Sequence, residues 1–344
     1  MSDSPRDQVI RAIEHRAPDY VPAWYNYFAS EARQLHGDRL LQLMAQYDDD
    51  VIFAVLSTFP PADQWPLGWT DEWGCTWERG AVGAVSTTSP LHDSWNELPT
   101  YLNSGLPRLG ERVDLLGRVV DLRTRCPDRY LIATTWLAIF ERLRSLRGAE
   151  NVLMDLYLHP LELETLRDAV AAEFIDQIRG SAAAGADAVL LADDWGTQVG
   201  MLIRPEQWRQ FFAATYRGLV DEIHAHGMHA WFHSCGQIRP IIPDLIEAGF
   251  DVLHPLQPSA MDLAEISDSF RGRICFAGGV DVQDWLPLGD ADEVEVEIKA
   301  LIDTLAAPQG GYIIAPTNSI MPDTPWENIE TMCRTMYDYG HRTR

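Results

Sequence analysis

The sequence MHAWFHSCGQIRPIIPDLIEAGFDVLHPLQ, at residues 228–257, contains the pattern that decides the fold. It predicts a buried strand over residues 228–233, a helix over 238–248 that ends at Gly249, and a second strand over 251–254. A strand, a helix and a further strand form the unit of parallel sheets, because the helix returns the chain to the end where the first strand began. Both strands are mostly apolar, which is typical of strands covered on both faces.

The same alternation extends over most of the chain. It predicts eight strands, of which the other six are residues 21–25, 51–56, 130–134, 187–192, 273–277 and 312–315. Eight strand–helix units indicate a closed barrel rather than an open sheet. No glycine-rich phosphate-binding motif follows the first strand, which argues against a nucleotide-binding sheet. We therefore predict the α/β class: a single (β/α)8 TIM barrel with an N-terminal helical segment from Ser4 and a long insertion after the second strand, over residues 58–107.

The composition restricts the partners of the protein. The 344 residues include 27 Lys and Arg against 51 Asp and Glu, a formal net charge of −24. This balance argues against nucleic acid or an anionic membrane as a partner, because both need a positive face. The sequence offers no signal-peptide pattern and no apolar stretch of membrane-spanning length. Five scattered cysteines do not suggest a disulfide framework, so we expect a cytoplasmic protein.

The active site of such a barrel lies at the carboxyl ends of its strands. The polar residues predicted there are Asn26, Tyr27, Asp193, Asp194, His233, Cys235, His254, Gln257, Asp281 and Asn318. His233 and Cys235 lie two residues apart in an extended segment, so both side chains face the barrel mouth. An imidazole beside a thiolate suits zinc, which needs at least one further protein ligand. Asp193, Asp194, His254, Gln257 and Asn318 are the candidates for completing the site.

We assign two further kinds of role to these residues. Asp193, His254 and Asn318 are candidate catalytic residues, and Tyr27, Trp136, Asp194 and Gln257 are candidate substrate-binding residues. Adjacent strand residues face opposite ways, so one of Asp193 and Asp194 faces the mouth while the other faces the helices. The alternatives are a loop cap or an ion pair with Arg204 for the aspartates, and a buried histidine beside an inert thiol for His233 and Cys235.

Several segments together resemble the uroporphyrinogen decarboxylase-like superfamily. They are residues 233–236, 241–253, 255–257, 277–281, 310–316 and 322–328, with 71–74 and 147–148. The resemblance covers nearly the whole chain. It implies one (β/α)8-barrel domain over residues 1–344, with the site at the strand ends.

Two branches of this superfamily differ in chemistry. The decarboxylase branch needs no cofactor and holds its porphyrinogen carboxylates with arginines of an N-terminal motif. The corresponding residues 21–28 contain no arginine, and the first one nearby is Arg33. The other branch resembles methylcobamide:thiol methyltransferases and, more remotely, cobalamin-independent methionine synthase, in which His-x-Cys and a later cysteine bind zinc. His233 and Cys235 match that motif, whereas Asn318 stands at the position of the later cysteine.

The leading hypothesis is therefore a zinc-assisted, corrinoid-linked methyltransferase or demethylase that acts on a small methylated compound, with a corrinoid protein as partner. Replacing a thiolate ligand makes zinc more Lewis acidic, which suits activation of an ether or carboxylate oxygen. One alternative is a metal-independent decarboxylase or lyase of a small carboxylated substrate. The other is a non-catalytic barrel that binds a corrinoid or a partner protein. The sequence leaves the oligomeric state open, with a homodimer among the alternatives.

Overall fold

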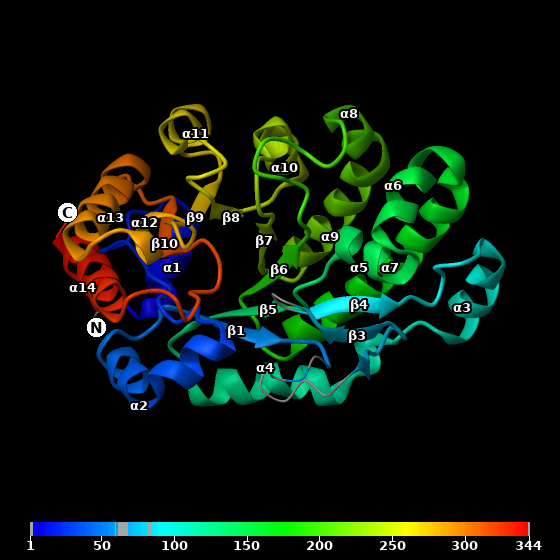
Figure 1. Cartoon of the computed structure of the whole chain (residues 1–344), viewed down its shortest axis with the longest axis horizontal. Helices are drawn as coiled ribbons and strands as arrows, with labels where there is room; N and C mark the ends of the chain where they lie inside the picture. Colours follow the sequence, from blue (N-terminus) through cyan, green and yellow to red (C-terminus); the bar gives the residue numbers. More distant parts are fainter. Residues whose placement is uncertain (1–2, 59, 61–67, 81–83, 343–344) are drawn as a thin grey trace.

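The computed structural model of the chain describes residues 3–58, 60, 68–80 and 84–342. Its main sheet contains seven parallel strands in the order β1-β5-β6-β7-β8-β9-β10. The strands are Val51–Val55 (β1), Tyr130–Thr134 (β5), Ala188–Ala192 (β6), His229–His233 (β7), Val252–Leu256 (β8), Cys275–Val280 (β9) and Tyr312–Pro316 (β10). The α/β class and seven of the eight predicted strands are thus confirmed. The sheet is curled, so that its strands surround a common interior (Figure 1).

Most helices lie around the outside of this curled sheet (Figure 1). They are Pro5–Ile13 (α1), Ser30–Gln46 (α2), Leu98–Ser104 (α3), Val113–Arg125 (α4), Ile139–Arg147 (α5), Ala149–Leu158 (α6), Pro160–Ala183 (α7), Pro205–Trp208 (α8), Ala214–Ala225 (α9), Ile242–Ala248 (α10), Leu263–Phe270 (α11), Trp285–Leu288 (α12), Ala291–Leu305 (α13) and Trp326–Arg342 (α14). A π-helical turn, Arg209–Ala213, joins α8 to α9. Among the helices in the described ranges, none has the length and apolar character needed to cross a membrane.

The region between β1 and β5 contains a second, smaller sheet. Its three antiparallel strands are Trp69–Thr70 (β2), Thr76–Arg79 (β3) and Ala84–Thr88 (β4). The buried carboxylate of Asp71 accepts hydrogen bonds from the backbone of Trp73 and Cys75 and from the indole of Trp77. It also forms a fully buried ion pair with Arg142 of α5, at 2.7 Å. This pair attaches the small sheet to the helix that follows β5.

The interior of the curled sheet is filled by side chains two residues apart along each strand, as the pleat requires. The members of this cluster on the seven strands are Val51, Tyr130, Ile132, Ala188, Leu190, Trp231, Val252, Cys275, Ala277, Ile313 and Ala315. Val9, Ala12 and Ile13 of α1 pack against the same cluster. The predicted N-terminal helix is confirmed: Ser4 caps α1 and Pro5 is its first residue. Because α1 is apolar on this side, it closes the amino end of the interior.

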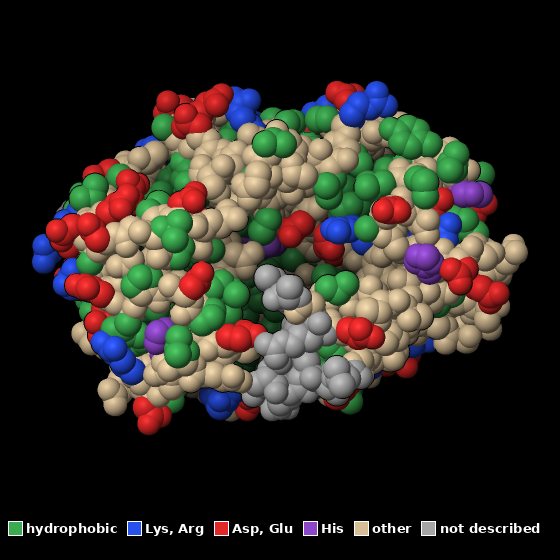
Figure 2. Space-filling view, in the orientation of Figure 1, with side chains coloured by type: hydrophobic (Ala, Val, Ile, Leu, Met, Phe, Trp, Pro, Cys, Tyr) green, Lys and Arg blue, Asp and Glu red, His purple; other side chains and the backbone are tan. Residues whose placement is uncertain are grey.

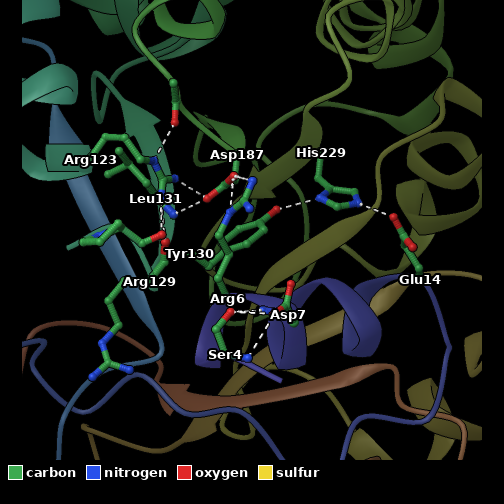
Figure 3. A network of polar contacts seen from close by, with 12 residues as sticks. Ser4, Arg6, Asp7, Glu14, Arg123, Arg129, Tyr130, Leu131, Asp187 and His229 are labelled. Carbon is green, nitrogen blue, oxygen red and sulfur yellow. Dashed lines mark hydrogen bonds and ion pairs between the residues drawn. The ribbon is translucent and has the colours of Figure 1, made fainter. Parts of the chain in front are cut away.

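Asp187, which directly precedes β6, fixes α1 in that position (Figure 3). Its Oδ1 accepts two hydrogen bonds from Arg6 of α1, at 2.8 Å from Nε and 2.6 Å from Nη2. Its Oδ2 accepts from Arg123 of α4 and from the backbone N–H of Leu131, the latter at 2.9 Å. The Asp187 side chain is only 5% exposed. One buried carboxylate therefore joins α1, α4 and β5 at the amino end of the sheet.

The eighth predicted strand, residues 21–25, is not confirmed as a full strand. It forms a single parallel bridge between Ala23 and Ile314 of β10, and Asp50 at the start of β1 donates its N–H to the Ala23 carbonyl at 3.0 Å. Pro22 has no N–H to give to a ladder. Ala23 donates to the Asp50 side chain instead, at 2.9 Å. A carboxylate thus replaces the backbone partner that a regular ladder would have supplied.

Asp49, directly before Asp50, also binds backbone N–H groups, and it makes stability depend on pH. Its Oδ1 accepts from the N–H groups of Tyr25, at 2.6 Å, and Asn26, at 3.1 Å. Burial raises the pKa of Asp49 to about 7, against the lowering effect of these two bonds. An acid whose pKa is higher in the folded than in the unfolded chain contributes stability that is complete below about pH 4 and is lost as the pH rises towards 7.

Asp49→Asn is expected to remove this pH dependence, because an amide keeps an acceptor oxygen but does not ionise. Between pH 4.5 and 7.5 the free energy of unfolding of the wild type should fall relative to the variant by about 2–4 kcal/mol. Urea denaturation at both pH values measures the difference. Any pH-independent cost of the new amide cancels in this comparison. Parallel stability curves for the two proteins would contradict the role given to Asp49.

Candidate functional site

The strand register brings four of the predicted site residues to one side of the sheet. Ala192 of β6 is paired with His233 of β7, and His233 is paired with His254 of β8. Paired residues of parallel strands point to the same side, and the residues two positions further along point there as well. Asp194 and Cys235 follow Ala192 and His233 by two residues. All four side chains therefore lie at the carboxyl ends of the strands.

Three of these side chains form what we call the Asp194–His233–Cys235 group. His233 Nε2 lies 3.6 Å from Asp194 Oδ1 and 3.5 Å from Cys235 Sγ, and the three ligand atoms are all within 4.8 Å of one another. A tetrahedral zinc ion bound by nitrogen, oxygen and sulfur at ordinary bond lengths would set its ligands roughly 3.3–3.6 Å apart. The two distances from His233 Nε2 match this spacing, and the three donors are of the kinds that hold a zinc ion with an open fourth position.

The protonation states in this group are compatible with metal binding. Burial lowers the pKa of His233, although the nearby Asp194 carboxylate raises it, so the imidazole is neutral and has a free lone pair. Burial, together with the nearby Asp194 charge, raises the pKa of Cys235 to about 12. The Cys235 thiol therefore keeps its proton in the metal-free protein, and a coordinating metal ion would displace that proton.

Two glycines hold the strands of this group together. A Cβ on Gly236 would lie 2.5 Å from the carbonyl carbon of Gly196, and one on Gly196 would lie 2.5 Å from the Cys235 oxygen. The loops after β6 and β7 are thus in backbone contact, which keeps Asp194 beside Cys235. Gln257 supports the same loop, because its Oε1 accepts from the N–H of Gly236 at 2.9 Å.

Asp193, predicted as a catalytic residue or ligand, points away from the group. Its Oδ2 accepts from the Ile139 N–H at 2.9 Å and from the Tyr216 hydroxyl at 2.6 Å, and its Oδ1 accepts from the Glu141 N–H at 2.8 Å. Asp193 is fully buried, and burial raises its pKa to about 7. Its carboxylate orients the first turn of α5 rather than a ligand in the cavity. Of the two aspartates, it is Asp194, predicted to bind substrate and also a candidate ligand, that lies beside His233 and Cys235.

Glu141, in the first turn of α5, was missed by the sequence analysis. Burial raises its pKa, the ion pair with Arg144 lowers it, and the charge of Asp194 raises it. The charge of Glu141 also raises the pKa of Cys235. The signal available in the sequence was its position at the start of the helix after β5, although nothing there indicated which way the side chain points.

His254 lies behind His233 and away from the other ligand atoms. The two Nδ1 atoms are 2.7 Å apart, and the ring centroids are 4.9 Å apart. The rings of Trp24 and Tyr27 pack on His254, with centroid distances of 5.6 and 6.5 Å. Burial lowers the pKa of His254 well below its usual value, and the neighbouring His233 lowers it further. His254 is therefore a neutral, immobilised neighbour of His233.

A cavity of about 1020 Å³ opens beside this group. Tyr27, Trp136, Cys235, Gln257 and Asn318 are among the residues that line it. Figure 2 shows the surface hollowed near the middle of the face, with acidic side chains at the edge of the hollow. The Asn318 amide donates to Cys235 Sγ at 3.7 Å, and the rings of Tyr27 and Trp136 are parallel within 8°, with centroids 6.2 Å apart. Five predicted residues thus share one cavity that a small organic molecule can enter.

The described residues that line the cavity include no lysine or arginine. Arg33, the first arginine after residues 21–28, uses its guanidinium to bind the backbone carbonyls of Asn26, at 3.0 Å, and Phe28, at 3.2 Å. It therefore supports the loop that carries Tyr27. A substrate with many carboxylates needs arginine side chains directed at it. The described residues of the cavity wall offer no arginine for this purpose.

Comparison with known proteins identifies the family and shows a similar fold in two solved structures. The family model described as uroporphyrinogen decarboxylase (URO-D) matches residues 106–339. Among solved structures, a methyltransferase from Methanosarcina mazei has a similar fold, with a TM-score of 0.75, 16% sequence identity, and coverage of 98% of this chain and 99% of that one. A B12-independent methionine synthase from Shewanella sp. W3-18-1, in complex with selenomethionine, gives a TM-score of 0.50 at 10% identity, over 92% and 94% of the two chains. At such identities the likeness concerns the fold. No curated protein matches the sequence significantly.

Proposed function

Because the chain belongs to the uroporphyrinogen decarboxylase family, we propose that it is an enzyme whose active site is the cavity beside the Asp194–His233–Cys235 group. We propose that it transfers a methyl group from a small methylated compound with the help of a zinc ion. The observation that carries this proposal is the convergence of three different zinc-binding side chains within 4.8 Å at the carboxyl ends of neighbouring strands. The match in fold to a methyltransferase supports it.

The proposal includes the complete barrel. Residues 22–24 take the place of the eighth strand between β10 and β1, since they exchange hydrogen bonds with Ile314 on one side and Asp50 on the other. In this arrangement residues 58–107 are an insertion after β1, and the chain forms one (β/α)8 domain. A barrel closed in this way places the carboxyl ends of all its strands around one cavity.

Each residue has a distinct task in this mechanism. Asp194, His233 and Cys235 would hold the zinc ion, which supplies Lewis acidity towards an oxygen or nitrogen of the methyl donor. The parallel rings of Tyr27 and Trp136 provide a flat wall that orients the donor and excludes water. Asn318, whose amide reaches Cys235, positions the group that leaves when the methyl group departs.

The methyl acceptor in this proposal is a corrinoid carried by a partner protein. The support is the His-x-Cys motif at His233 and Cys235, shared with methylcobamide-dependent enzymes, together with the size of the cavity. A corrinoid has to approach the donor from outside the barrel, and the cavity opens to the surface (Figure 2). An assay with a purified corrinoid protein and a panel of methylated compounds tests this step.

A second candidate function is decarboxylation of a small carboxylated substrate without a metal. The family match favours this function, since the family model takes its description from a decarboxylase. The absence of lysine and arginine from the described cavity wall weighs against a substrate with several carboxylates. Release of CO2 that is unaffected by chelators would identify this activity.

The metal content of the purified protein separates the two candidates. Elemental mass spectrometry of the wild type is expected to find about one zinc ion per chain, because three side chains that could serve as ligands of a catalytic zinc ion lie together. His233→Ala is expected to reduce the zinc content to background, since it removes the nitrogen that contacts both other ligand atoms. A zinc-free wild type that remains folded and releases CO2 would overturn methyl transfer in favour of decarboxylation.

A further inference from the structure

The contact between His233 and His254 constrains where each ring carries its hydrogen. Their Nδ1 atoms are 2.7 Å apart, and the two residues are only 7% and 1% exposed. At this distance one nitrogen must be an N–H donor and the other must offer a lone pair. Among the described residues, His254 is the only hydrogen-bond partner of His233 Nδ1. The hydrogen therefore sits either on His233 or on His254.

The opposite edge of the His233 ring decides between these two arrangements. Its Nε2 faces Asp194 Oδ1 and Cys235 Sγ, at 3.6 and 3.5 Å. A metal ion at this group needs the lone pair of Nε2, and a neutral imidazole with a free Nε2 carries its hydrogen on Nδ1. That hydrogen then points at His254 Nδ1, which has to be the acceptor.

The surroundings of His254 hold its ring in one orientation. Its backbone carbonyl accepts from the Ser234 N–H at 2.9 Å, so β7 and β8 are joined at this residue. Trp24 and Tyr27 pack against its ring and prevent rotation. Nδ1 of His254 is therefore held in one direction, towards His233.

We infer that His254 is a positioning residue that keeps the hydrogen of His233 on Nδ1, so that Nε2 of His233 presents its lone pair to the metal ion. This inference rests on the proposed function, because it assigns a task within the same zinc site. His254 was predicted to be a catalytic residue. In this inference it supports the ligand His233 instead, and it touches neither the metal ion nor the substrate. Partners of this kind fix the tautomer and the ring orientation of a ligating histidine.

Two variants of His254 test the inference through zinc affinity, without any activity assay. His254→Phe fills the space of the ring and removes the acceptor, so we expect the zinc dissociation constant to rise about 10–100-fold. His254→Asn places an acceptor oxygen near the position of Nδ1, so its affinity should stay within a few-fold of the wild type. Competition with a chromogenic chelator measures both. Equal affinities for the wild type and the phenylalanine variant would overturn the inference while leaving the zinc site intact.

A measurement on the wild type tests the same point without a substitution. In 15N-labelled protein, the ring nitrogens of His233 are expected to show the Nδ1–H form, both with and without zinc. A hydrogen on Nε2 in the metal-free protein would overturn the positioning role. If the wild type binds no zinc, the proposed function fails, and this spectrum still decides the inference: Nδ1–H supports it and Nε2–H refutes it.

Discussion

Cys235→Ala is expected to lower kcat/KM for methyl transfer at least about 1000-fold, since losing a ligand of a catalytic metal removes several kcal/mol of stabilisation from the transition state. The substitution takes away one of the three ligand atoms of the group and the acceptor of the Asn318 amide. Initial rates with the corrinoid protein and a methyl donor, measured beside zinc content, give the effect. A zinc-free Cys235→Ala protein with wild-type turnover would contradict the metal-assisted mechanism.

Cys275→Ala is the matched control for this experiment. Cys275 is a buried thiol that packs in the apolar interior at the start of β9, whereas Cys235 is half-buried beside the cavity. The same loss of a thiol there should leave zinc content and turnover unchanged and cost about 1 kcal/mol of stability for the small cavity. An equal loss of activity in both variants would show that the effect of Cys235→Ala comes from general destabilisation.

The largest effect on stability is expected for Asp187→Ala, which should lower the free energy of unfolding by about 3–5 kcal/mol. The variant leaves the guanidinium groups of Arg6 and Arg123 and the N–H of Leu131 without their shared acceptor (Figure 3). Urea denaturation at neutral pH measures the loss. The effect should be independent of zinc, because Asp187 lies at the opposite end of the strands from the candidate site.

Asp121→Ala provides the comparison for Asp187→Ala. Asp121 pairs with Arg125 on the surface of α4, where the two side chains are 59% and 62% exposed. Exposed ion pairs of this kind contribute about 0–1 kcal/mol, so this variant should stay close to the wild type. Similar losses in the free energy of unfolding of the two variants would mean that burial does not determine how much Asp187 contributes to stability.

The strands were predictable because they are buried on both faces, so that almost all of their side chains are apolar. The segment 130–134 was predicted with the bounds that β5 has in the structure, and 312–315 differs from β10 by one residue. Their interior and exterior faces are both covered, so the composition alone marks where they begin and end. The helix predicted over residues 205–226 also exists, although a π-helical turn divides it.

The candidate site was predictable as a set of strand ends but not as a geometry. His233 and Cys235 belong together because they lie two residues apart at the carboxyl end of β7. Which of Asp193 and Asp194 joins them depends on the register between β6 and β7, where Ala192 is opposite His233. Register is a long-range property set by packing and loop geometry, so a single chain segment does not contain it.

The irregular form of residues 21–25 has a different physical cause. The segment is apolar, but it contains Pro22, and its neighbour at the start of β1 carries two aspartates. Asp49 and Asp50 take up the N–H groups that a ladder would have used. Aspartate side chains that accept hydrogen bonds from backbone N–H groups leave no periodic pattern in the sequence, so their effect on this segment could not be predicted.

The position of α1 has a consequence for the order in which the chain folds. α1 precedes every strand in the sequence, yet Arg6 and Asp187 are separated by 181 residues, and the Ala12 carbonyl accepts from Gly311, just before β10. Contacts between such distant residues form slowly, because the entropy of closing the intervening chain must be overcome first. The N-terminal helix therefore has its complete set of partners only when the last strand has been added. Protection of the α1 amides against hydrogen exchange during refolding should accordingly rise together with that of β10.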